Sequence, residues 1–456
     1  MQNKFGRDFT TGSIPQHIIF FSLPMLIGNL LQTAYNIVDT IWVGKYVGPE
    51  GVGATAASFP IVFILIALSS GATIATTILV SHYFGAKEFE DLKKVVDTSY
   101  VLGFFISSVL TITGILLSGK ILEIMNTPSE IIDLARSYLT ITLSGFCFTY
   151  FGFLIPSILR GIGDTVTPLI FLAIGVVLNS ILDPLLIIGI GPFPKLGLQG
   201  AAYASVFSQV VVFICSVIYL NKKNHLTSLK LKGISFDRHF ALQIFKIGLP
   251  SIVQQSLISI GNAFITTFVN AFGVNAIAAF GAASRIDSIA FMPAMSLGMA
   301  SSAITGQNLG AKKPERIYEV FKWGIIMTIS ITGTISLFAL LFPEQLISLF
   351  VSDKAVIEIG KGYLNLVAFS YVFFAVMFIS NGIINGSGHT FVTMVFSLVS
   401  LWLIRVPLSA TLPGLGFGIK GIWISIVVSF ATVMTISIFY FLSGKWKKPV
   451  VRHKNS

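Results

Sequence analysis

Twelve long apolar stretches run through the sequence, and they constrain its fold more than any other feature. Each is long enough to cross a bilayer as a helix, which takes about 20 residues. The stretches are residues 15–43, 52–83, 95–119, 131–158, 166–190, 198–220, 242–271, 275–307, 320–342, 358–384, 388–412 and 418–443. Because the bilayer interior offers the backbone no hydrogen-bond partners, stretches of this length predict helices. We therefore expect an all-α integral membrane protein with twelve transmembrane helices.

The charge content agrees with a chain that lies mostly in lipid. Only 11% of the 456 residues are charged, and the mean hydropathy is +0.85, whereas soluble domains carry about 25% charged residues. Most lysine and arginine residues fall at the two termini and in alternate loops, which predicts that these parts are cytoplasmic. The net charge of +11 is thus a topology signal. The expected partner is the lipid bilayer, and nucleic acid is not expected.

The sequence repeats itself once. Gly85-Ala86-Lys87 recurs in the second half as Gly310-Ala311-Lys312, and Leu23-Pro24 recurs at nearly the same offset as Leu249-Pro250. Arg160-Gly-Ile-Gly-Asp-Thr165 likewise has a counterpart in Asn385-Gly-Ser-Gly-His-Thr390. Each repeat holds an even number of spans, so both halves enter the membrane from the same side. Such parallel repeats are an architecture of secondary transporters.

The repeat predicts the domain organisation. We expect two pseudo-symmetric six-helix lobes, residues 1–220 and 239–456, joined by a cytoplasmic loop at 221–238, which is the longest polar segment between spans. Cys147 and Cys215 both lie in apolar stretches. No disulfide framework is therefore expected.

A polar segment interrupts the apolar stretch 166–190. Asn179 and Asp183 are four residues apart and share one face of a helix. Pro184 follows at once; it lacks an N–H and crowds the carbonyl of Ser180, which loosens the helix beside the acid. A carboxylate inside a membrane is costly and marks a functional site by default. An ion pathway or coupling site explains the segment, and the alternative is an acid neutralised by a hidden structural partner.

A second acid ends a polar stripe in the first span. Asn29, Gln32, Asn36 and Asp39 follow one another at helical spacing, with Tyr35 one turn before the acid. Such a stripe faces a cavity or another helix, because its amides find no partners in lipid. The first and fifth spans both run outward, so the two acids are expected at comparable depth. If adjacent, they bind protons as a coupled pair or hold a small hard cation; the alternative is two separate acids at helix ends.

The second half lacks both acids. Ile265 falls opposite Asp39 and Val406 opposite Asp183, although Pro407 matches Pro184. Ion coupling is therefore predicted in the first half only. We expect the second half to shape a substrate cavity, through Gln254, Gln255, Asn262 and Arg285 together with Asn29 and Gln32 of the first half. For Arg285 the alternatives are a local pair with Asp287 or extension to the outer surface.

Two patterns typical of nucleotide-binding sites occur in the sequence, but each lacks a feature that the site requires. Gly114 to Lys120 fits a phosphate-binding loop, but Ile121 replaces the required Ser or Thr. Gly416-x-Gly418-x-x-Gly421 joins two membrane spans and follows no strand. Neither a nucleophile–base pair nor a metal-binding cluster is evident, so we predict no enzyme and no cofactor. The energy for transport must then come from an ion gradient or from an outside partner.

As a set, these residues resemble one known family. Leu23-Pro24, Asp39, Arg160 to Thr165, and Asn179-x-x-x-Asp183-Pro184 are similar to the motifs of multidrug and toxic compound extrusion (MATE) transporters, over nearly the whole chain. The resemblance implies a V-shaped pair of lobes and alternating access. It also implies export of amphipathic, mostly cationic drugs in exchange for cations.

The resemblance also implies a cation site. Its members would be Asp39, Asn179 and Asp183, which are also possible Na⁺ ligands, with the hydroxyl of Ser205. The supporting network would comprise Tyr35, Asn36, Tyr138 and Pro184. One branch of the family has a second-lobe sodium site built from carboxylates in spans seven and ten, and this chain has no acid in either. It is more similar to the DNA-damage-inducible protein F branch, in which an arginine resembling Arg285 is associated with the substrate cavity.

The sequence thus predicts an H⁺- and/or Na⁺-coupled multidrug antiporter, a monomer in the inner (plasma) membrane of a prokaryote. The choice between the two ions stays open, because carboxylates and amide oxygens suit both. One alternative is a flippase for lipid-linked precursors, which needs several cations in its cavity, whereas this chain offers mainly Arg285. The other is a membrane enzyme or receptor that transports nothing.

Overall fold

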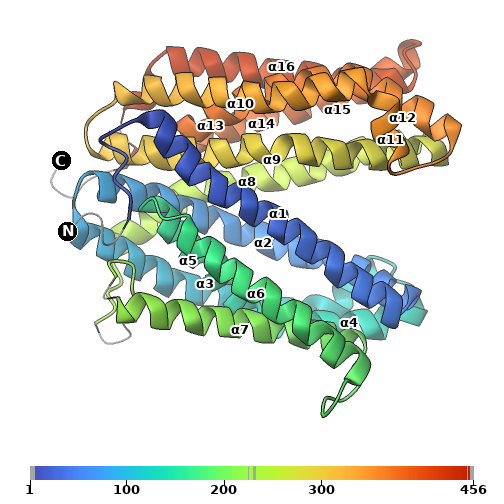
Figure 1. Cartoon of the computed structure of the whole chain (residues 1–456), viewed down its shortest axis with the longest axis horizontal. Helices are drawn as coiled ribbons and strands as arrows, with labels where there is room; N and C mark the ends of the chain where they lie inside the picture. Colours follow the sequence, from blue (N-terminus) through green and yellow to red (C-terminus); the bar gives the residue numbers. More distant parts are fainter. Residues whose placement is uncertain (1–5, 224, 230–232, 449, 452–456) are drawn as a thin grey trace. The chain divides into compact units, whose positions relative to one another are not determined.

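The computed structural model describes residues 6–223, 225–229, 233–448 and 450–451, and these residues form helices and connecting turns without a strand (Figure 1). The predicted all-α fold is confirmed. The helices are α1 (Ile14–Tyr46), α2 (Pro49–Gly85), α3 (Phe89–Ile124), α4 (Ser129–Ser144), α5 (Phe146–Gly161), α6 (Val166–Pro184), η2 (Leu185–Gly189), α7 (Leu198–Lys222), α8 (Arg238–Asn270), α9 (Val274–Gly310), α10 (Arg316–Leu341), α11 (Pro343–Ser348), α12 (Lys354–Val367), α13 (Tyr371–Gly386), α14 (Thr390–Ser397), η4 (Leu398–Arg405), α15 (Val406–Thr411) and α16 (Ile419–Leu442).

The number of membrane spans agrees with the prediction. Within the described residues, 11 helical segments are long and apolar enough to cross a membrane, and α4 with α5 forms one further span that bends by 49°. The bend falls at Gly145, where the backbone φ is −90° and ψ is 0°. A side chain there would overlap Val206 of α7. The bent span is therefore shaped by its close approach to α7.

The sequence repeat reappears as a repeat of backbone conformation. Four positions with positive φ in the first half have counterparts in the second, with nearly equal angles. The pairs are Gly48 and Gly273 (91° and 89°), Lys87 and Lys312 (62° and 57°), Gly163 and Gly388 (85° and 87°), and Gly197 and Gly418 (56° and 53°). Left-handed backbone is unusual for a residue with a side chain, so its recurrence at both lysines shows that the two halves turn alike.

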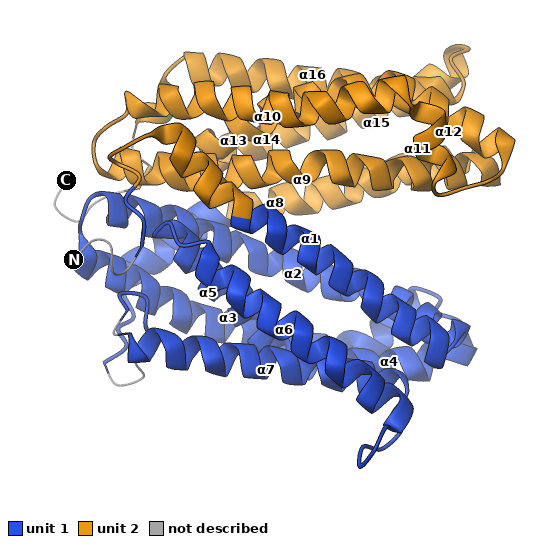
Figure 2. Ribbon diagram, viewed as in Figure 1, with its two compact units in different colours: residues 1–8, 24–248 blue, residues 9–23, 249–456 orange. Residues whose placement is uncertain are grey.

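Two compact units make up the chain (Figure 2). Unit 1 comprises residues 1–8 and 24–248, and unit 2 comprises residues 9–23 and 249–456. Unit 2 therefore includes the first turns of α1, the helix that opens the first half. Unit 1 includes the first turns of α8, the helix that opens the second half. The changeovers lie at Leu23-Pro24 and just before Leu249-Pro250, where a proline interrupts the helical hydrogen bonding.

The segment between the two halves belongs to unit 1. Three of its carbonyls accept hydrogen bonds: Leu229 from Asn221 Nδ2 (2.9 Å), Thr227 from Tyr100 Oη (3.1 Å), and Ser228 from Lys93 Nζ (2.7 Å). Residues 224 and 230–232 of the predicted 221–238 loop, and the outermost residues of both termini, lie outside the described residues. The described part of this loop is thus packed on the end of α3.

In unit 2, α9 and α13 pack through small residues. A Cβ atom at Gly382 would overlap the backbone oxygen of Gly298, and one at Gly386 would overlap that of Ser302. Within lipid there is no hydrophobic force between helices, so association depends on such close packing. The pattern of small residues four apart on each helix fixes this contact.

We expect Gly382→Ala to destabilise the protein, because its methyl group has no room against α9; overpacking of this kind costs about 1–3 kcal/mol. Gly281→Ala is the matched control, since a Cβ at this helical glycine of α9 meets nothing within 4 Å. The comparison uses the apparent melting temperature of the purified proteins in one detergent. Equal melting temperatures for the two variants would contradict the packing described here.

Candidate functional site

The polar residues predicted in the first half come from four helices of unit 1. Asp39 lies on α1, Tyr138 on α4, Asn179 and Asp183 on α6, and Ser205 on α7. Asp183 is completely buried and Asn179 is 2% exposed, whereas Asp39 and Ser205 are half-buried. The two buried groups therefore depend on protein partners for their hydrogen bonds.

Asn179 connects Asp183 to the neighbouring helix. Its Nδ2 donates to Asp183 Oδ2 (2.7 Å), and its Oδ1 accepts from the backbone N–H of Ser205 (3.0 Å) and from the Ser205 hydroxyl (3.2 Å). We assign the amide in this orientation because both of its ends are then satisfied. Ser205 also lies 3.4 Å from the hydroxyl of Tyr35. The hydroxyl that the family resemblance implied is therefore in contact with the amide.

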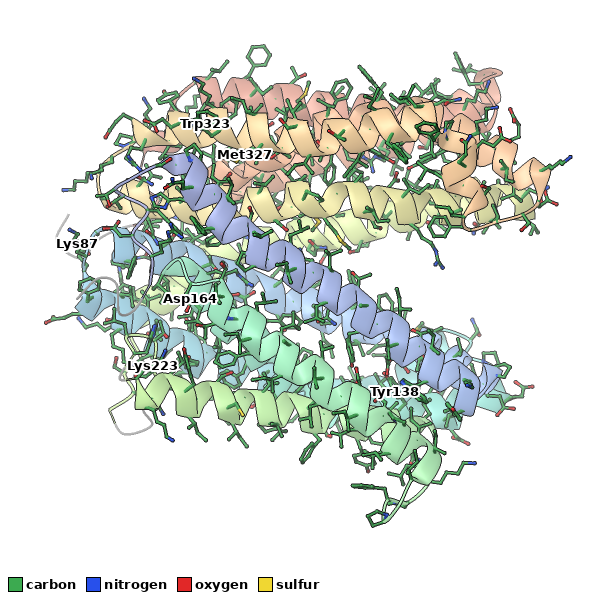
Figure 3. The ribbon with its side chains drawn as sticks, viewed as in Figure 1. Lys87, Tyr138, Asp164, Lys223, Trp323 and Met327 are labelled. Atoms are coloured by element: carbon green, nitrogen blue, oxygen red, sulfur yellow. The ribbon has the colours of Figure 1, made fainter. Side chains whose placement is uncertain are left out.

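The two acids lie within electrostatic reach of one another. Asp183 interacts with Asp39, and Tyr35 and Tyr138 each interact with both carboxylates. Tyr138 lies toward the end of unit 1 opposite to Lys87, Asp164 and Lys223 (Figure 3). The acids and phenols thus gather around one place, away from the basic end of the unit.

The helix that carries Asp183 changes form directly after the acid. It is α-helical to Pro184 and continues as a π-helix from Leu185 to Gly189. The carbonyls of Leu186 and Ile187 accept hydrogen bonds from Leu196 and Gly197 (3.0 and 3.2 Å) in the turn before α7. π-Helical turns are rare and are frequent at functional sites. The predicted loosening beside Asp183 therefore occurs one residue beyond Pro184.

The amide stripe of α1 is exposed in its middle part. Gln32 and Asn36 are exposed, Asn29 is half-buried, and Gln32 Nε2 donates to Asn36 Oδ1 (3.2 Å). Asn29 and Gln32 remain candidate cavity residues, and Asn36 remains a candidate for the network that supports the cation site.

The candidate cavity residues of unit 2 differ in their exposure and in their hydrogen bonding. Gln254 Nε2 donates to the carbonyl of Thr393 (3.2 Å) and to Ser397 Oγ (2.8 Å), so this amide joins α8 to α14. Asn262 is exposed and Gln255 half-buried. Arg285 is exposed, and its guanidinium lies over the ring of Phe350, 5.8 Å from the centroid. The packing role of Gln254 makes it the weakest of these candidates for contact with a substrate.

One polar cluster was missed by the sequence reasoning. Asp287 was considered only as a local partner of Arg285, yet its carboxylate accepts hydrogen bonds from Tyr363 (2.5 Å) and Tyr371 (2.6 Å). The signal was present in the repeat, because Tyr363 is the counterpart of Tyr138 at the same offset that relates Lys312 to Lys87.

The ligand types at the first-half site limit the ions that it can hold. No group of three or more His, Cys, Asp or Glu side chains able to hold a metal ion occurs in the part of the chain that the structure describes. Asp39, Asp183, Asn179 and Ser205 offer carboxylate, amide and hydroxyl oxygens. Oxygen ligands suit small hard cations rather than transition metals.

A sequence profile of the MatE family matches the chain twice, over residues 24–185 and 250–411. The chain belongs to the MatE family. The two matches start at Pro24 and Pro250, the pair that marks the repeat, and the first match contains Asp39, Asn179 and Asp183. The family comprises multidrug efflux transporters.

Individual relatives match this chain over nearly its whole length. The chain is 33% identical to the probable multidrug resistance protein YpnP of Bacillus subtilis over 440 residues, 96% of this chain and 97% of that protein. It is 31% identical to the probable multidrug resistance protein YoeA of the same organism over 96% and 95%. A solved outward-facing multidrug resistance MATE family transporter of the MOP superfamily matches with a TM-score of 0.89 and 26% identity, covering 97% and 98% of the two chains.

We expect Asn179→Ala to lower the stability of the protein, because it leaves the buried Asp183 carboxylate without its amide donor; such a loss costs about 1–3 kcal/mol. Asn36→Ala is the control, since Asn36 is an exposed amide on α1. Thermal unfolding of both variants in the same detergent gives the comparison. A melting temperature for Asn179→Ala as high as that of Asn36→Ala would show that the amide does not hold the acid.

Proposed function

We propose that this MatE family protein is a cation-coupled antiporter that exports amphipathic, mostly cationic drugs by alternating access. The observation that carries the proposal is the pair of carboxylates, Asp39 and Asp183, gathered with an amide and three hydroxyls in one unit of a multidrug transporter. The relatives named multidrug resistance proteins support the substrate class. The lipid-linked precursor flippase and the enzyme gain no support from them.

Asp39 and Asp183 perform different tasks in the proposed cycle. Asp183 is completely buried and bonded to Asn179, so it is the fixed member of the pair. Asp39 is half-buried on α1, so it is the member that an ion from solution reaches first. A proton or Na⁺ arriving between them relieves the repulsion of two like charges in a region of low polarity.

Ion binding then changes the packing of unit 1. With a cation between them, the two carboxylates attract a shared partner instead of repelling each other, which draws α1 toward α6. Differential ion binding of this kind is what shifts a protein between two conformations. The π-helical segment after Pro184 lies next to the site and provides a backbone able to follow the change. We propose that the conformation with the bound cation is the one that releases the drug.

The remaining assignments belong to the same proposal. The coupling ion is H⁺ and/or Na⁺, the protein acts as a monomer, and both termini are on the cytoplasmic side of the prokaryotic plasma membrane. The proposed substrate-contacting residues are Asn29, Gln32, Gln254, Gln255, Asn262 and Arg285. The membership of the DNA-damage-inducible protein F branch also stays a prediction.

We expect Asp39→Asn and Asp183→Asn each to abolish gradient-driven drug efflux, because an amide is neutral and cannot exchange a proton or attract a cation. Asp353→Asn is the matched control: Asp353 caps α12 through the backbone N–H groups of Ala355 and Val356, and asparagine caps a helix equally well.

The measurement is efflux of a fluorescent cationic dye from proteoliposomes, under a proton gradient alone and then under a sodium gradient alone. The wild type and Asp353→Asn should respond to at least one gradient, and the gradient that works identifies the ion. Normal efflux by both Asp39→Asn and Asp183→Asn would contradict the coupling proposal.

A further inference from the structure

Asp287 of unit 2 is a half-buried carboxylate at the place that corresponds to the proposed ion site of unit 1. Tyr363 of α12 is the counterpart of Tyr138 of α4 at the spacing of the repeat, and Arg405 directly precedes Val406, the counterpart of Asp183. In unit 1, Tyr138 interacts electrostatically with both acids. In unit 2, Tyr363 donates a hydrogen bond to Asp287. The two halves thus bring a carboxylate to the equivalent tyrosine from different helices.

The surroundings of Asp287 hold it rigidly. Tyr363 donates to Oδ2 (2.5 Å) and Tyr371 donates to Oδ1 (2.6 Å), so each carboxylate oxygen accepts one phenolic hydrogen. Both phenols are themselves buried, and their rings pack against aromatic neighbours: Tyr363 edge-on to Trp423 (4.7 Å between centroids) and Tyr371 edge-on to Phe291 (5.5 Å). Two donors of this kind stabilise the charged carboxylate rather than the acid.

A permanent cation stands near this carboxylate. Arg405 ends the π-helix η4 and directly precedes Val406, which packs against the cluster that contains Tyr363 and Tyr371. From this position its guanidinium acts electrostatically on Asp287 and Tyr363. The interaction acts through space, because Nε of Arg405 donates to Ser429 Oγ (2.7 Å) and the guanidinium lies over the ring of Phe430, 4.5 Å from its centroid. The groups that face Asp287 are therefore Tyr363 of α12, Tyr371 of α13 and Arg405 of η4.

We propose that unit 2 contains a vestigial cation site whose cation is built into the chain, with the guanidinium of Arg405 standing in for the exchangeable ion of unit 1. A carboxylate within a membrane needs a compensating positive charge. In unit 1 the groups that act on Asp183 are a second acid, Asp39, the phenols Tyr35 and Tyr138, and the neutral amide of Asn179. None of these groups is a cation, so we infer that the compensating charge comes from solution. In unit 2 the compensating positive charge belongs to a side chain of the protein, Arg405. An arginine keeps its charge at any physiological pH.

The assignment has a functional consequence. A site that is filled at all times cannot respond to an ion gradient, so unit 2 keeps one charge state throughout the cycle while unit 1 changes. Removal of the guanidinium should uncover a site for a small cation at Asp287, with two carboxylate oxygens and two phenolic oxygens as possible ligands. Hard cations such as Na⁺ prefer oxygen ligands of this kind.

The test uses full-length protein carrying Asp39→Asn and Asp183→Asn, which silence the site of unit 1. Arg405→Gln is added to this background in lipid nanodiscs. The melting temperature is then measured in sodium chloride and in choline chloride at equal ionic strength, and also from pH 8 to pH 5. We expect sodium or acid to raise the melting temperature of the Arg405→Gln protein by at least about 3 °C, because a ligand bound only to the folded state stabilises it.

Three controls sharpen the result. The background protein should not respond, and neither should Arg285→Gln, which removes the exposed arginine two residues from Asp287. Adding Asp287→Asn to Arg405→Gln should abolish the response, because the amide needs no cation. Arg405→Lys, which keeps a positive charge, should behave as the background does.

Two results would overturn the proposal. One is an Arg405→Gln protein that folds stably and responds neither to sodium nor to acid. The other is a response already present in the background and lost with Asp287→Asn, since the site would then be open. If Arg405→Gln alone does not fold, Arg405→Gln with Asp287→Asn should restore the yield of folded protein, and failure to do so contradicts the pairing. No arm of the test measures transport, so its outcome is independent of the proposed drug export.

Discussion

A carboxylate in a membrane-spanning helix must find a partner, and this requirement explains the polar architecture of both units. In unit 1 the amide of Asn179 lies between Asp183 and Ser205, and joins α6 to α7 by hydrogen bonds that neither helix makes alone. In unit 2 two buried phenols hold Asp287. The free energy of leaving such a group unpaired is several times that of an ordinary hydrogen bond. Each acid therefore determines which helices pack around it.

The two units place different charges on a similar backbone. The positive φ angles at four pairs of turns show that the turns between helices are shared, and a π-helix occurs near the proline in both, after Pro184 and before Pro407. Unit 1 has two acids and no built-in cation among the groups acting on Asp183. Unit 2 has one acid and Arg405. A similar backbone thus carries two acids in one half, and one acid with an arginine acting on it in the other.

Much of this organisation was predictable from the sequence, because it depends on periodicity. Apolar length predicts the spans, the internal repeat predicts the two halves, and the helical spacing of Asn179 and Asp183 places both on one helical face. Three features depend on contacts between distant residues and were not predictable. Gln254 proved to bond with α14, Asp287 proved to bond with Tyr363 and Tyr371 rather than Arg285, and the first turns of α1 group with unit 2.

The central claim is that the coupling ion acts on unit 1 and leaves unit 2 unchanged. Hydrogen–deuterium exchange of the full-length protein in nanodiscs, with and without the coupling ion, tests it most directly. The account predicts that exchange slows in residues 29–46 and 179–205, around the two acids, while residues 255–271 and 402–426, their counterparts, exchange at the same rate in both conditions. Ion-dependent protection confined to residues 402–426, with no change in 179–205, would contradict it.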